Sequence, residues 1–404
     1  MNASAIRCVN DLALYEKLKG HSDVKRVNQQ IERHEAEGPT GIRRNLLATS
    51  VRLTSGMAPE ISKMADECIE RLGVELPLEL YVYSSPQFNA ACFKPEDERL
   101  YVMFSSSLLE GFNSQELKFV MGHELGHHVY DHHAIPIGYL LRGGNARTTP
   151  DPQLALELFA WSRYAEISAD RAGAHCAQNM DAVARALFKL SSGLTSKVVQ
   201  FSLDDFVAQV DDMQVGDSEP GVGSSQADWF STHPFSPLRV KALKLFEKSE
   251  LYSPKAGAMS KADVEVAVQA VLSLMEPSYL EAKTDTAEAM RRLLFAGLIA
   301  VADAHGGISE PELEVFAKFF GKYAFTDKLD IEKIKQTLPV RVKEVNTKAS
   351  EPQRMQVLHD MCTMADANGG VHPAERVALD EVAKMMDIPR SFICQCLESC
   401  KDLD

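Results

Sequence analysis

The sequence predicts a mainly helical chain of class α+β whose C-terminal part is all-α. Apolar residues recur at helical spacing between residues 117 and 129, and a second helical pattern runs from about Leu154 to Ala177. Closer to the C-terminus, residues 302–308 recur as residues 365–371, which indicates a duplicated helix-turn-helix unit. At 404 residues with 45% hydrophobic content, the chain is long enough for two or three domains.

The first 54 residues are expected to form a helical extension that packs on the following domain. They show no basic n-region followed by an apolar h-region, as a secretory signal would. Further along the chain, the longest apolar run is Leu293–Ala302, far short of the ~20 residues that span a bilayer. We therefore expect a cytoplasmic protein without a transmembrane segment.

A helix is expected to start after residue 113. Asn113 or Ser114 can serve as its N-cap, with Glu116 close behind. Gly122 and Gly126 lower the helix propensity but permit another element to pack closely. The apolar stripe of this helix consists of Leu117, Val120, Met121, Leu125 and Val129.

The run His123-Glu124-Leu125-Gly126-His127, an HExxH pattern, is the most informative motif of the chain. Since an α-helix has about 3.6 residues per turn, the two histidines lie on one face and can bind one metal ion together. Glu124 lies about 100° around the helix, where it can act as general base toward a water on the metal. The alternative is a buried, hydrogen-bonded histidine pair. Three further histidines are expected to be solvated: His128, His132 and His133.

A catalytic zinc ion needs a third protein ligand besides two histidines, with a fourth position left open for water. The best candidate is Glu166, and Asp170 follows one helical turn later. Such a pair places one carboxylate on the metal and the other within reach of the free N–H of a ligand histidine. Considered alone, the pair would more often be a solvated face on which Arg163 pairs with Glu166. The preceding histidine motif favours the metal site.

Further segments add to these motifs: Asn89–Phe93, Leu100–Phe104, Ser107–Leu109, and Ser231-Thr232-His233-Pro234 followed by Arg239. With them, the chain resembles the HtpX-like and CAAX-prenyl-endopeptidase-like family of zinc metallopeptidases, which belongs to the gluzincins. The resemblance covers roughly residues 58–246. It implies a zincin-type domain, and the first two segments look like the family's strand pair, so the expected class becomes α+β with a small sheet.

The resemblance implies one zinc ion per chain, bound by His123, His127 and Glu166. It also implies that Glu124 is the general base and that Asp170 orients a ligand histidine, most simply His123. Two roles are open for His233: it stabilises the oxyanion, or it caps the zinc in a resting state. A His-Pro turn without chemistry is the plain alternative.

An extended substrate could pair with the strand Leu100–Phe104, because added strands bind through backbone hydrogen bonds. The alternative is an ordinary core strand. Between residues 198 and 238 the chain has no Lys or Arg, while acidic residues and glycines accumulate. We interpret this stretch as a long mobile loop. Because it leads into His233, its residues Gly216–Ser225 are either a gate over the zinc or a passive surface insertion.

The duplicated unit falls in a separate helical domain, expected over residues 256–404. Each copy passes through two glycines and places a glutamate, Glu312 or Glu375, at a matching offset. This part resembles the TerB-like (tellurite-resistance) domain, which suggests sensing or assembly with a protein partner. The ligand run of an EF-hand is missing, so we favour helix capping as the role of these acidic residues. Metal binding is the alternative.

The eight cysteines have no disulfide-scaffold spacing, so we expect reduced thiols. The cluster Cys394, Cys396 and Cys400 lacks the second half of a zinc-finger spacing. A formal charge of -14 argues against nucleic acid or an anionic membrane as the main partner, because phosphate binding needs clustered basic residues.

Two functions follow for a chain with an extension over residues 1–54, a peptidase domain over 55–255 and the helical domain. The first is a soluble zinc endopeptidase that acts on protein or peptide substrates through metal-activated water. It could be latent, gated by the loop that carries His233. The second is a metal-stabilised, proteolytically latent binding or chaperone-like protein that acts through the TerB-like domain. The intact Glu124 argues against the second.

Overall fold

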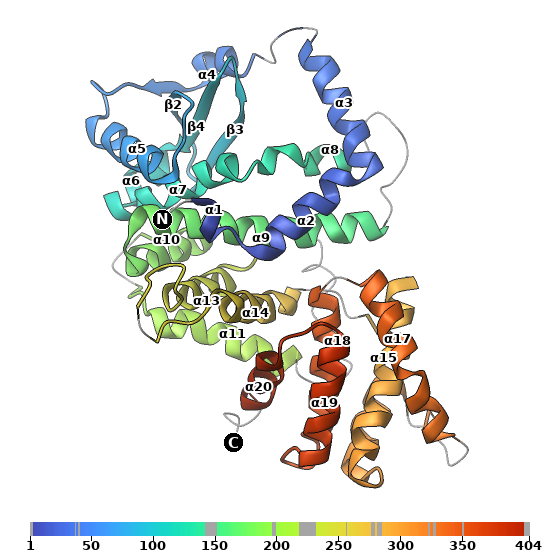
Figure 1. The fold of residues 1–404 in the computed structure, drawn as a ribbon. Coiled ribbons are helices and arrows are strands. Elements are labelled where there is room, and N and C mark those ends of the chain that lie inside the picture. Colours follow the sequence, from blue (N-terminus) through green and yellow to red (C-terminus); the bar gives the residue numbers. More distant parts are fainter. Residues whose placement is uncertain are drawn as a thin grey trace. The chain divides into compact units, whose positions relative to one another are not determined.

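The computed structural model describes residues 3–36, 38, 41–141, 152–195, 199–217, 232–255, 257–275, 279–280, 285–321, 324–325, 329–349 and 351–399. The chain divides into two compact units (Figure 1). The first contains Met1–Val210 and Phe230–Glu265, and the second contains Asp211–Trp229 and Val266–Asp404. The expected domain limits at residues 54 and 255 do not coincide with this division, because residues 1–54 lie within the first unit.

The first unit contains a four-stranded mixed sheet with strand order β1-β2-β4-β3. Strand β4 pairs in parallel with β2 and antiparallel with β3, and β1 pairs antiparallel with β2. The sheet and the surrounding helices agree with the predicted α+β class. The strands are β1 (Val51–Leu53), β2 (Leu78–Tyr83), β3 (Ala90–Glu96) and β4 (Arg99–Ser105).

The central place of β4 corrects one expectation. Both of its edges are occupied by other strands, so Leu100–Phe104 cannot pair with a substrate, and it is the core strand of the alternative interpretation. Leu100, Tyr101 and Val102 are fully buried there. Strand β3 is one of the two edge strands of the sheet, and its pairing register with β4 shifts between Phe93 and Glu96, around Pro95. Proline is tolerated at such an edge because its missing N–H has no neighbour to bond.

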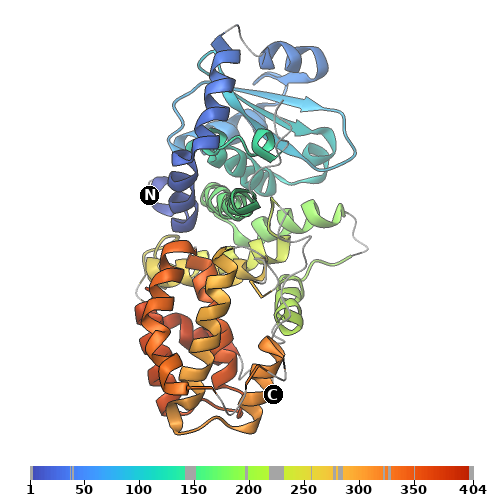
Figure 2. The same cartoon turned by 90° about the vertical axis from the view of Figure 1, so that its right-hand side faces the viewer.

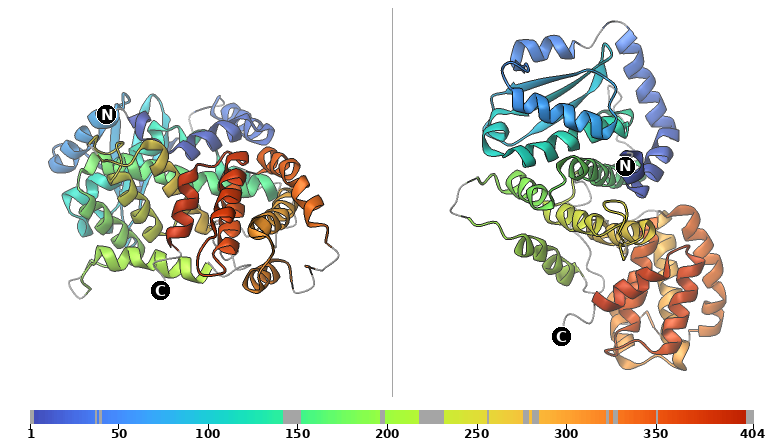
Figure 3. Two further views of the ribbon diagram at one scale, coloured as in Figure 1. Left: turned by 60° about the horizontal axis from the view of Figure 1, so that its bottom comes forward. Right: turned by 60° about the vertical axis from the view of Figure 1, so that its left-hand side comes forward.

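Two antiparallel helices, α7 (Ser114–Val129) and α9 (Pro152–Ala177), form the centre of the first unit. Figure 2 shows α9 nearly end-on beneath the sheet, and the right-hand view in Figure 3 shows α5 in front of the sheet. The limits of α7 and α9 agree with the helices predicted after residue 113 and from about Leu154 to Ala177. The other helices of this unit are α5 (Pro59–Leu72), α6 (Ser106–Gly111), η1 (His132–Ala134), α8 (Ile137–Leu141), α10 (Met180–Ser192) and α13 (Ser236–Glu247).

The N-terminal residues are helical up to Thr49 and then enter the sheet as β1. Helix α2 lies against α9, and its buried side chains include Asn10 and Asp11. The backbone N–H of Cys8 donates to Ser168 Oγ of α9 at 3.1 Å. The segment is therefore built into the fold of the first unit. Its helices are α1 (Ala3–Ile6), α2 (Val9–Gly20), α3 (Ser22–Ala36) and α4 (Ile42–Thr49).

A further correction concerns the acidic stretch after residue 198. Residues Leu203–Asp217 form helix α11 rather than a loop. Ser202 Oγ accepts from the backbone N–H of Asp205 at the first turn, and Phe206 and Val210 are buried one turn apart. Acidic side chains in a first helical turn are favoured by the helix dipole, which a reading based on composition overlooks. Residues 218–231 lie outside the described part of the chain.

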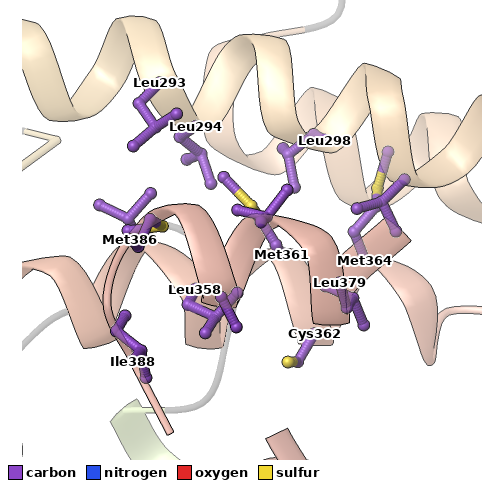
Figure 4. Packing of buried hydrophobic residues seen from close by; sticks show 14 of the residues in the cluster. Leu293, Leu294, Leu298, Leu358, Met361, Cys362, Met364, Leu379, Met386 and Ile388 are labelled. Carbon is purple, nitrogen blue, oxygen red and sulfur yellow. The ribbon is translucent and has the colours of Figure 1, made fainter. Parts of the chain in front are cut away.

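The second unit is a helical bundle around an apolar core (Figure 4). Met361 lies between Leu294 and Leu298 in that view, and a Cβ added to Gly297 would meet its Cε at 2.0 Å. Helices α15 and α18 therefore pack in close contact. The helices are α15 (Asp285–Ala302), η3 (Asp303–His305), α16 (Glu310–Phe320), α17 (Ile331–Lys348), α18 (Glu351–Ala365), α19 (Pro373–Met385) and α20 (Arg390–Ser399), while α14 (Lys261–Leu272) and η2 (Ser273–Met275) precede them.

Both copies of the duplicated unit are confirmed as helix-turn-helix. The first turn lies between α15 and α16, and the second lies between α18 and α19. Gly306 and Gly369 adopt φ of 100° and 74°, the left-handed conformation that ends the preceding helical turn. No helix among the described residues has the length and apolar character to cross a membrane.

Candidate metal centre

Helix α7 begins with the capping box that the sequence predicts. Asn113 Oδ1 accepts from the backbone N–H of Glu116 at 3.0 Å, and Glu116 Oε2 accepts from the backbone N–H of Asn113 at 2.8 Å. The buried carboxylate of Glu116 also binds Lys189 Nζ at 2.7 Å. This fixed start sets the rotation of the helix and points the face of His123 and His127 toward α9.

Small residues let α7 and α9 approach closely, as expected for Gly122 and Gly126. A Cβ added to Gly122 would lie 2.8 Å from Cys176, and one added to Gly126 would lie 2.9 Å from Ala172 Cβ. From the other side, a Cβ on Gly173 would lie 2.6 Å from the carbonyl oxygen of Phe119. The narrow contact brings the carboxylate of α9 within reach of the histidines of α7.

Three side chains from these helices converge on one point. His123 Nε2 and His127 Nε2 lie 3.2 Å apart. Glu166 Oε2 lies 3.5 Å from His123 Nε2, and Glu166 Oε1 lies 3.5 Å from His127 Nε2. Ligands about 2.1 Å from a tetrahedral zinc ion are about 3.4 Å from one another. The three side chains therefore match three corners of such a site in both donor type and spacing.

The proton of His123 is fixed by Asp170. His123 Nδ1 lies 3.0 Å from Asp170 Oδ1. Burial opposes ionisation of this carboxyl, but the Arg239 guanidinium outweighs it and lowers the pKa of Asp170 to about 2. An ionised carboxylate only accepts hydrogen bonds, so Nδ1 of His123 carries a proton. Burial opposes ionisation of the ring, but the hydrogen bond to Asp170 and the charge of Glu166 raise the pKa of His123.

The proton of His127 is fixed by a longer chain of contacts. His127 Nδ1 lies 2.9 Å from Nδ1 of His132, whose Nε2 lies 3.1 Å from Asp11 Oδ2. When Nε2–H of His132 donates to Asp11 and its Nδ1 accepts, Nδ1 of His127 is the donor between the two rings. Burial and the neighbouring His123 lower the pKa of His127, so its neutral ring carries a lone pair on Nε2.

This chain corrects the expectation that His132 is solvated. Its side chain is 5% exposed and fully used in hydrogen bonding. Asp11 also accepts from three donors besides His132: Arg7, Trp161 and Ser168. A buried carboxylate with this many donors stays ionised, and the pKa of Asp11 is lowered to about 2 because His132 and Arg7 outweigh the cost of burial.

The two Nε2 atoms lie 3.2 Å apart, close enough to share one proton in a hydrogen bond. Glu166 completes the group, and one of its oxygens, Oε2, is buried without a hydrogen-bond donor. A cation bound here would replace the shared proton and pair with the carboxylate. The donor set of two neutral imidazoles and one carboxylate fits zinc.

Arg239 supports this centre from helix α13. Its guanidinium donates twice to Asp170, at 2.8 and 2.6 Å, and lies 3.5 Å from Glu166 Oε2. The sequence offered Arg239 only as part of a motif and gave it no role. Its partner lies 69 residues earlier, beyond the reach of any local pattern.

Glu124 lies beside the cluster and faces strand β3. Burial raises the pKa of its carboxyl, while His123 and a hydrogen bond with the backbone of Cys92 oppose this rise. No basic side chain in the described ranges forms an ion pair with Glu124. The carboxylate is thus close to the metal ligands and available to a proton.

His233 reaches the same place from the loop before α13. Its Nε2 lies 3.5 Å from Glu166 Oε1, and its Nδ1 lies 2.9 Å from Thr232 Oγ1. The carbonyl of Thr232 accepts from Ser162 Oγ of α9, which anchors the loop. The side chain is 65% exposed and does not belong to the group of atoms that lie mutually within 4.8 Å. The expected gate, Gly216–Ser225, falls mostly outside the described residues.

The cysteine cluster near the C-terminus contributes nothing to either candidate metal group in the described part of the chain. Cys394 and Cys396 are free thiols, as are the other described cysteines, and Cys400 lies outside the described residues.

Comparison with known proteins places these residues in a family context. Residues 56–143 and 151–247 match the model of peptidase family M48. The plastoglobule-localized metallopeptidase 48 of Arabidopsis thaliana is 30% identical over 216 residues, 51% of this chain and 62% of that protein. A protease HtpX homologue of Bifidobacterium longum is 27% identical over 46% of this chain and 70% of its own length. No solved structure matches significantly.

Residues 56–247 are thus similar to peptidase family M48. The chain spans less than two thirds of the Arabidopsis relative. The family match ends at residue 247, so the likeness of the second unit to TerB-like domains remains a prediction.

Proposed function

From the match of residues 56–143 and 151–247 to peptidase family M48, we propose that the chain is a zinc-dependent endopeptidase. The observation that carries the proposal is the convergence of His123 Nε2, His127 Nε2 and the Glu166 carboxylate, with Nδ1 of each histidine held by a partner behind it. These three residues would hold the ion. When bound, zinc supplies a Lewis acid that polarises the scissile carbonyl and makes water more acidic.

Glu124 is the general base of the proposed reaction. It takes a proton from the attacking water and delivers it to the nitrogen of the leaving amine. A base needs a pKa near the working range, and burial shifts that of Glu124 upward. Its hydrogen bond with the backbone of Cys92 fixes the carboxylate on the side of β3.

Asp170, His132 and Asp11 are positioning residues, since they act through the histidines. Asp170 keeps the proton of His123 on Nδ1, and Arg239 keeps Asp170 ionised. His132, which is itself held by Asp11, contacts Nδ1 of His127 in the same way. With both Nδ1 atoms held, the Nε2 atoms of both imidazoles are left to bind the ion.

For His233 we propose the role of oxyanion donor rather than cap. When Thr232 Oγ1 donates to Nδ1, the neutral ring carries its proton on Nε2, which faces Glu166 and the centre. A donor at that place can bond the oxygen of a tetrahedral intermediate. Its exposure and its separation from the three-ligand group support this role over zinc capping.

Strand β3 is the proposed docking edge for the substrate. Within the described residues it pairs with β4 alone, so its other edge can bind an extended peptide through backbone groups. The contact between Cys92 and Glu124 places this edge beside the base. The proposed substrate class is accordingly an extended protein segment, whose unpaired backbone groups can bond to this edge.

The proposal is tested by metal removal and return. Purified protein is stripped with a chelator and incubated with casein, an unfolded protein, before and after zinc is restored; a His233→Ala variant is assayed in parallel. We expect cleavage only with zinc, and a weaker rate in His233→Ala. Cleavage that survives complete zinc removal overturns the proposal. A variant faster than wild type reassigns His233 as a cap and makes the wild type latent.

A zinc-loaded protein that cleaves nothing, with or without His233, would instead support the second candidate, a latent binding or chaperone-like protein. An intact Glu124 beside the cluster argues against that outcome, because a binding protein has no use for a buried carboxylate there.

A further inference from the structure

The second unit contains another group of converging metal-type ligands. His305 of η3, Glu312 of α16 and Glu375 of α19 each place a ligand atom within 4.8 Å of the other two. His305 Nε2 lies 3.4 Å from Glu312 Oε1 and 3.8 Å from Glu375 Oε1. The two glutamates are the matching residues of the duplicated helix-turn-helix units, so the group lies where the two copies meet.

Each glutamate is held by one oxygen and presents the other. Glu312 Oε2 accepts from the backbone N–H of Ser309 at 2.6 Å, and Glu375 Oε2 accepts from the backbone N–H of His372 at 2.8 Å. These are the capping contacts expected from the sequence. The remaining oxygens, both Oε1, are buried without a hydrogen-bond partner and point into the group. Helix capping therefore explains the contacts of Oε2 in each glutamate but not the burial of Oε1.

The two carboxylates are buried side by side without a strong cation. Their side chains are 0% and 1% exposed, and His305 is the basic residue that lies beside both. Within the described part of the chain, no Lys or Arg forms an ion pair with either of them. Two like charges at this depth are unfavourable unless a positive charge joins them.

We propose that this group is a second metal site, in which His305 Nε2, Glu312 Oε1 and Glu375 Oε1 bind a first-row divalent cation such as Zn²⁺ or Mn²⁺. The separations of 3.4 and 3.8 Å are close to the spacing of about 3.4 Å between ligands of a tetrahedral ion. An imidazole nitrogen with two carboxylates suits these metals better than Ca²⁺ or Mg²⁺, which prefer oxygen alone. The side chain of His305 is 21% exposed, so water can complete the coordination.

The cation would tie the two copies of the unit together. The turns already touch, because Ser309 Oγ donates to Asn368 Oδ1 at 3.0 Å and the rings of His305 and His372 lie 5.5 Å apart. A metal bound by one glutamate from each copy adds a link that can be made or released with metal supply. The second unit would thus respond to metal independently of the peptidase centre.

The competing occupant is a single proton shared by the two carboxylates. Burial and the neighbouring Glu312 raise the pKa of Glu375 to about 7, so a protonated pair is chemically reasonable without metal. The two occupants differ in what they predict for metal stoichiometry.

The test counts bound metal in the full-length protein. Wild type, His127→Ala, Glu375→Gln and the double variant are dialysed against buffered zinc, and the metal per chain is measured by mass spectrometry. Glutamine at position 375 can still accept at the helix start, so the capping box and the fold are retained while the charged ligand is lost. Glu314→Gln, an exposed change on the same helix as Glu312, is the matched control.

We expect two ions in wild type and in Glu314→Gln, one in each single variant, and none in the double variant. Thermal unfolding of His127→Ala should shift upward with zinc or manganese, and this shift should vanish when Glu375→Gln is added. A wild type with one ion that His127→Ala removes would overturn the second site, and the proton would then be its occupant. A second ion that persists in both Glu375→Gln and His305→Ala would also overturn it. Neither outcome bears on the peptidase centre, whose ion is removed by His127→Ala.

Discussion

The Nδ1 atoms of His127 and His132 lie 2.9 Å apart, and this contact connects a proposed metal ligand to the first helices of the chain. His132 in turn contacts Asp11, a residue 116 positions before His127 in the sequence. In the proposed site, the N-terminal segment would therefore help to orient His127 toward the metal.

Replacing His132 by Phe should weaken zinc binding at the first centre. The ring volume is kept, but His127 loses the acceptor that holds its proton on Nδ1. Changes of this kind typically cost about 10- to 100-fold in metal affinity. The zinc dissociation constant, measured by competition with a chromogenic chelator in a Glu375→Gln background, checks this. His128→Phe, next to His127 but without a hydrogen bond to the cluster among the described residues, is the control. Equal affinity for wild type and His132→Phe would show that the contact has no such role.

Gly126→Ala should destabilise the first unit by about 1–3 kcal/mol, because overpacking a close helix contact forces the two helices apart. The new Cβ would lie 2.9 Å from Ala172 Cβ and 3.1 Å from Ala169 Cα, neither of which is a flexible side-chain end. Chemical denaturation measures the effect. Gly138→Ala is the matched change with no atom within 4 Å of the new Cβ, and it should leave stability within about 0.5 kcal/mol of wild type. A Gly126→Ala protein as stable as Gly138→Ala would mean that α7 and α9 are not in close contact.

Arg239→Gln should cost about 3–5 kcal/mol at neutral pH, since it leaves the buried charge of Asp170 unpaired. The pKa of Asp170 in the folded protein is about 2, below the ordinary value of about 3.9. A lowered folded-state pKa contributes stability that is complete above the ordinary pKa and is lost as pH falls toward 2.

The difference in free energy of unfolding between wild type and Arg239→Gln should therefore be largest above about pH 5 and should decrease toward pH 2. Urea unfolding of the metal-free proteins across this range measures it, and the exposed change Lys248→Gln should follow wild type throughout. A gap that stays constant with pH would separate Arg239 from the ionisation of Asp170.

Peptides with a methylated backbone nitrogen should be poorer substrates if the edge of β3 binds them. Each methyl group removes one donor and adds bulk at the strand edge, without changing the side chains. We expect kcat/KM to fall by at least about tenfold for methylation close to the scissile bond, which corresponds to about 1.4 kcal/mol. A series methylated at successive positions checks this by steady-state kinetics. Uniform rates across the series would exclude strand addition.

The sequence predicts those features that depend on residues close together in the chain. The helix start at Asn113, the shared face of His123 and His127, and the turn-apart pair of Glu166 and Asp170 all follow from helical spacing. The same holds for the two glycine turns of the duplicated unit. Residue spacing and contacts between near neighbours in the chain determine these features, and both can be inferred from a single sequence.

Features that depend on tertiary contact were missed or misjudged. The burial of His132 follows from Asp11, which lies 121 residues away, and the role of Arg239 follows from Asp170. No sequence pattern links Asp11 to His132 or Asp170 to Arg239. Whether the strand Leu100–Phe104 pairs with a substrate or lies in the core stays open in the sequence, because strand order in a sheet cannot be deduced from the strands themselves.

The central claim is that Glu124 is the base of a zinc endopeptidase. The most direct measurement compares casein cleavage by wild type and Glu124→Gln at equal, measured zinc content, with Glu110→Gln, an exposed change on α6, as control. We predict that wild type and the control cleave, and that Glu124→Gln retains its zinc but loses at least about a hundredfold in rate. Cleavage by zinc-loaded Glu124→Gln at the wild-type rate would contradict the account.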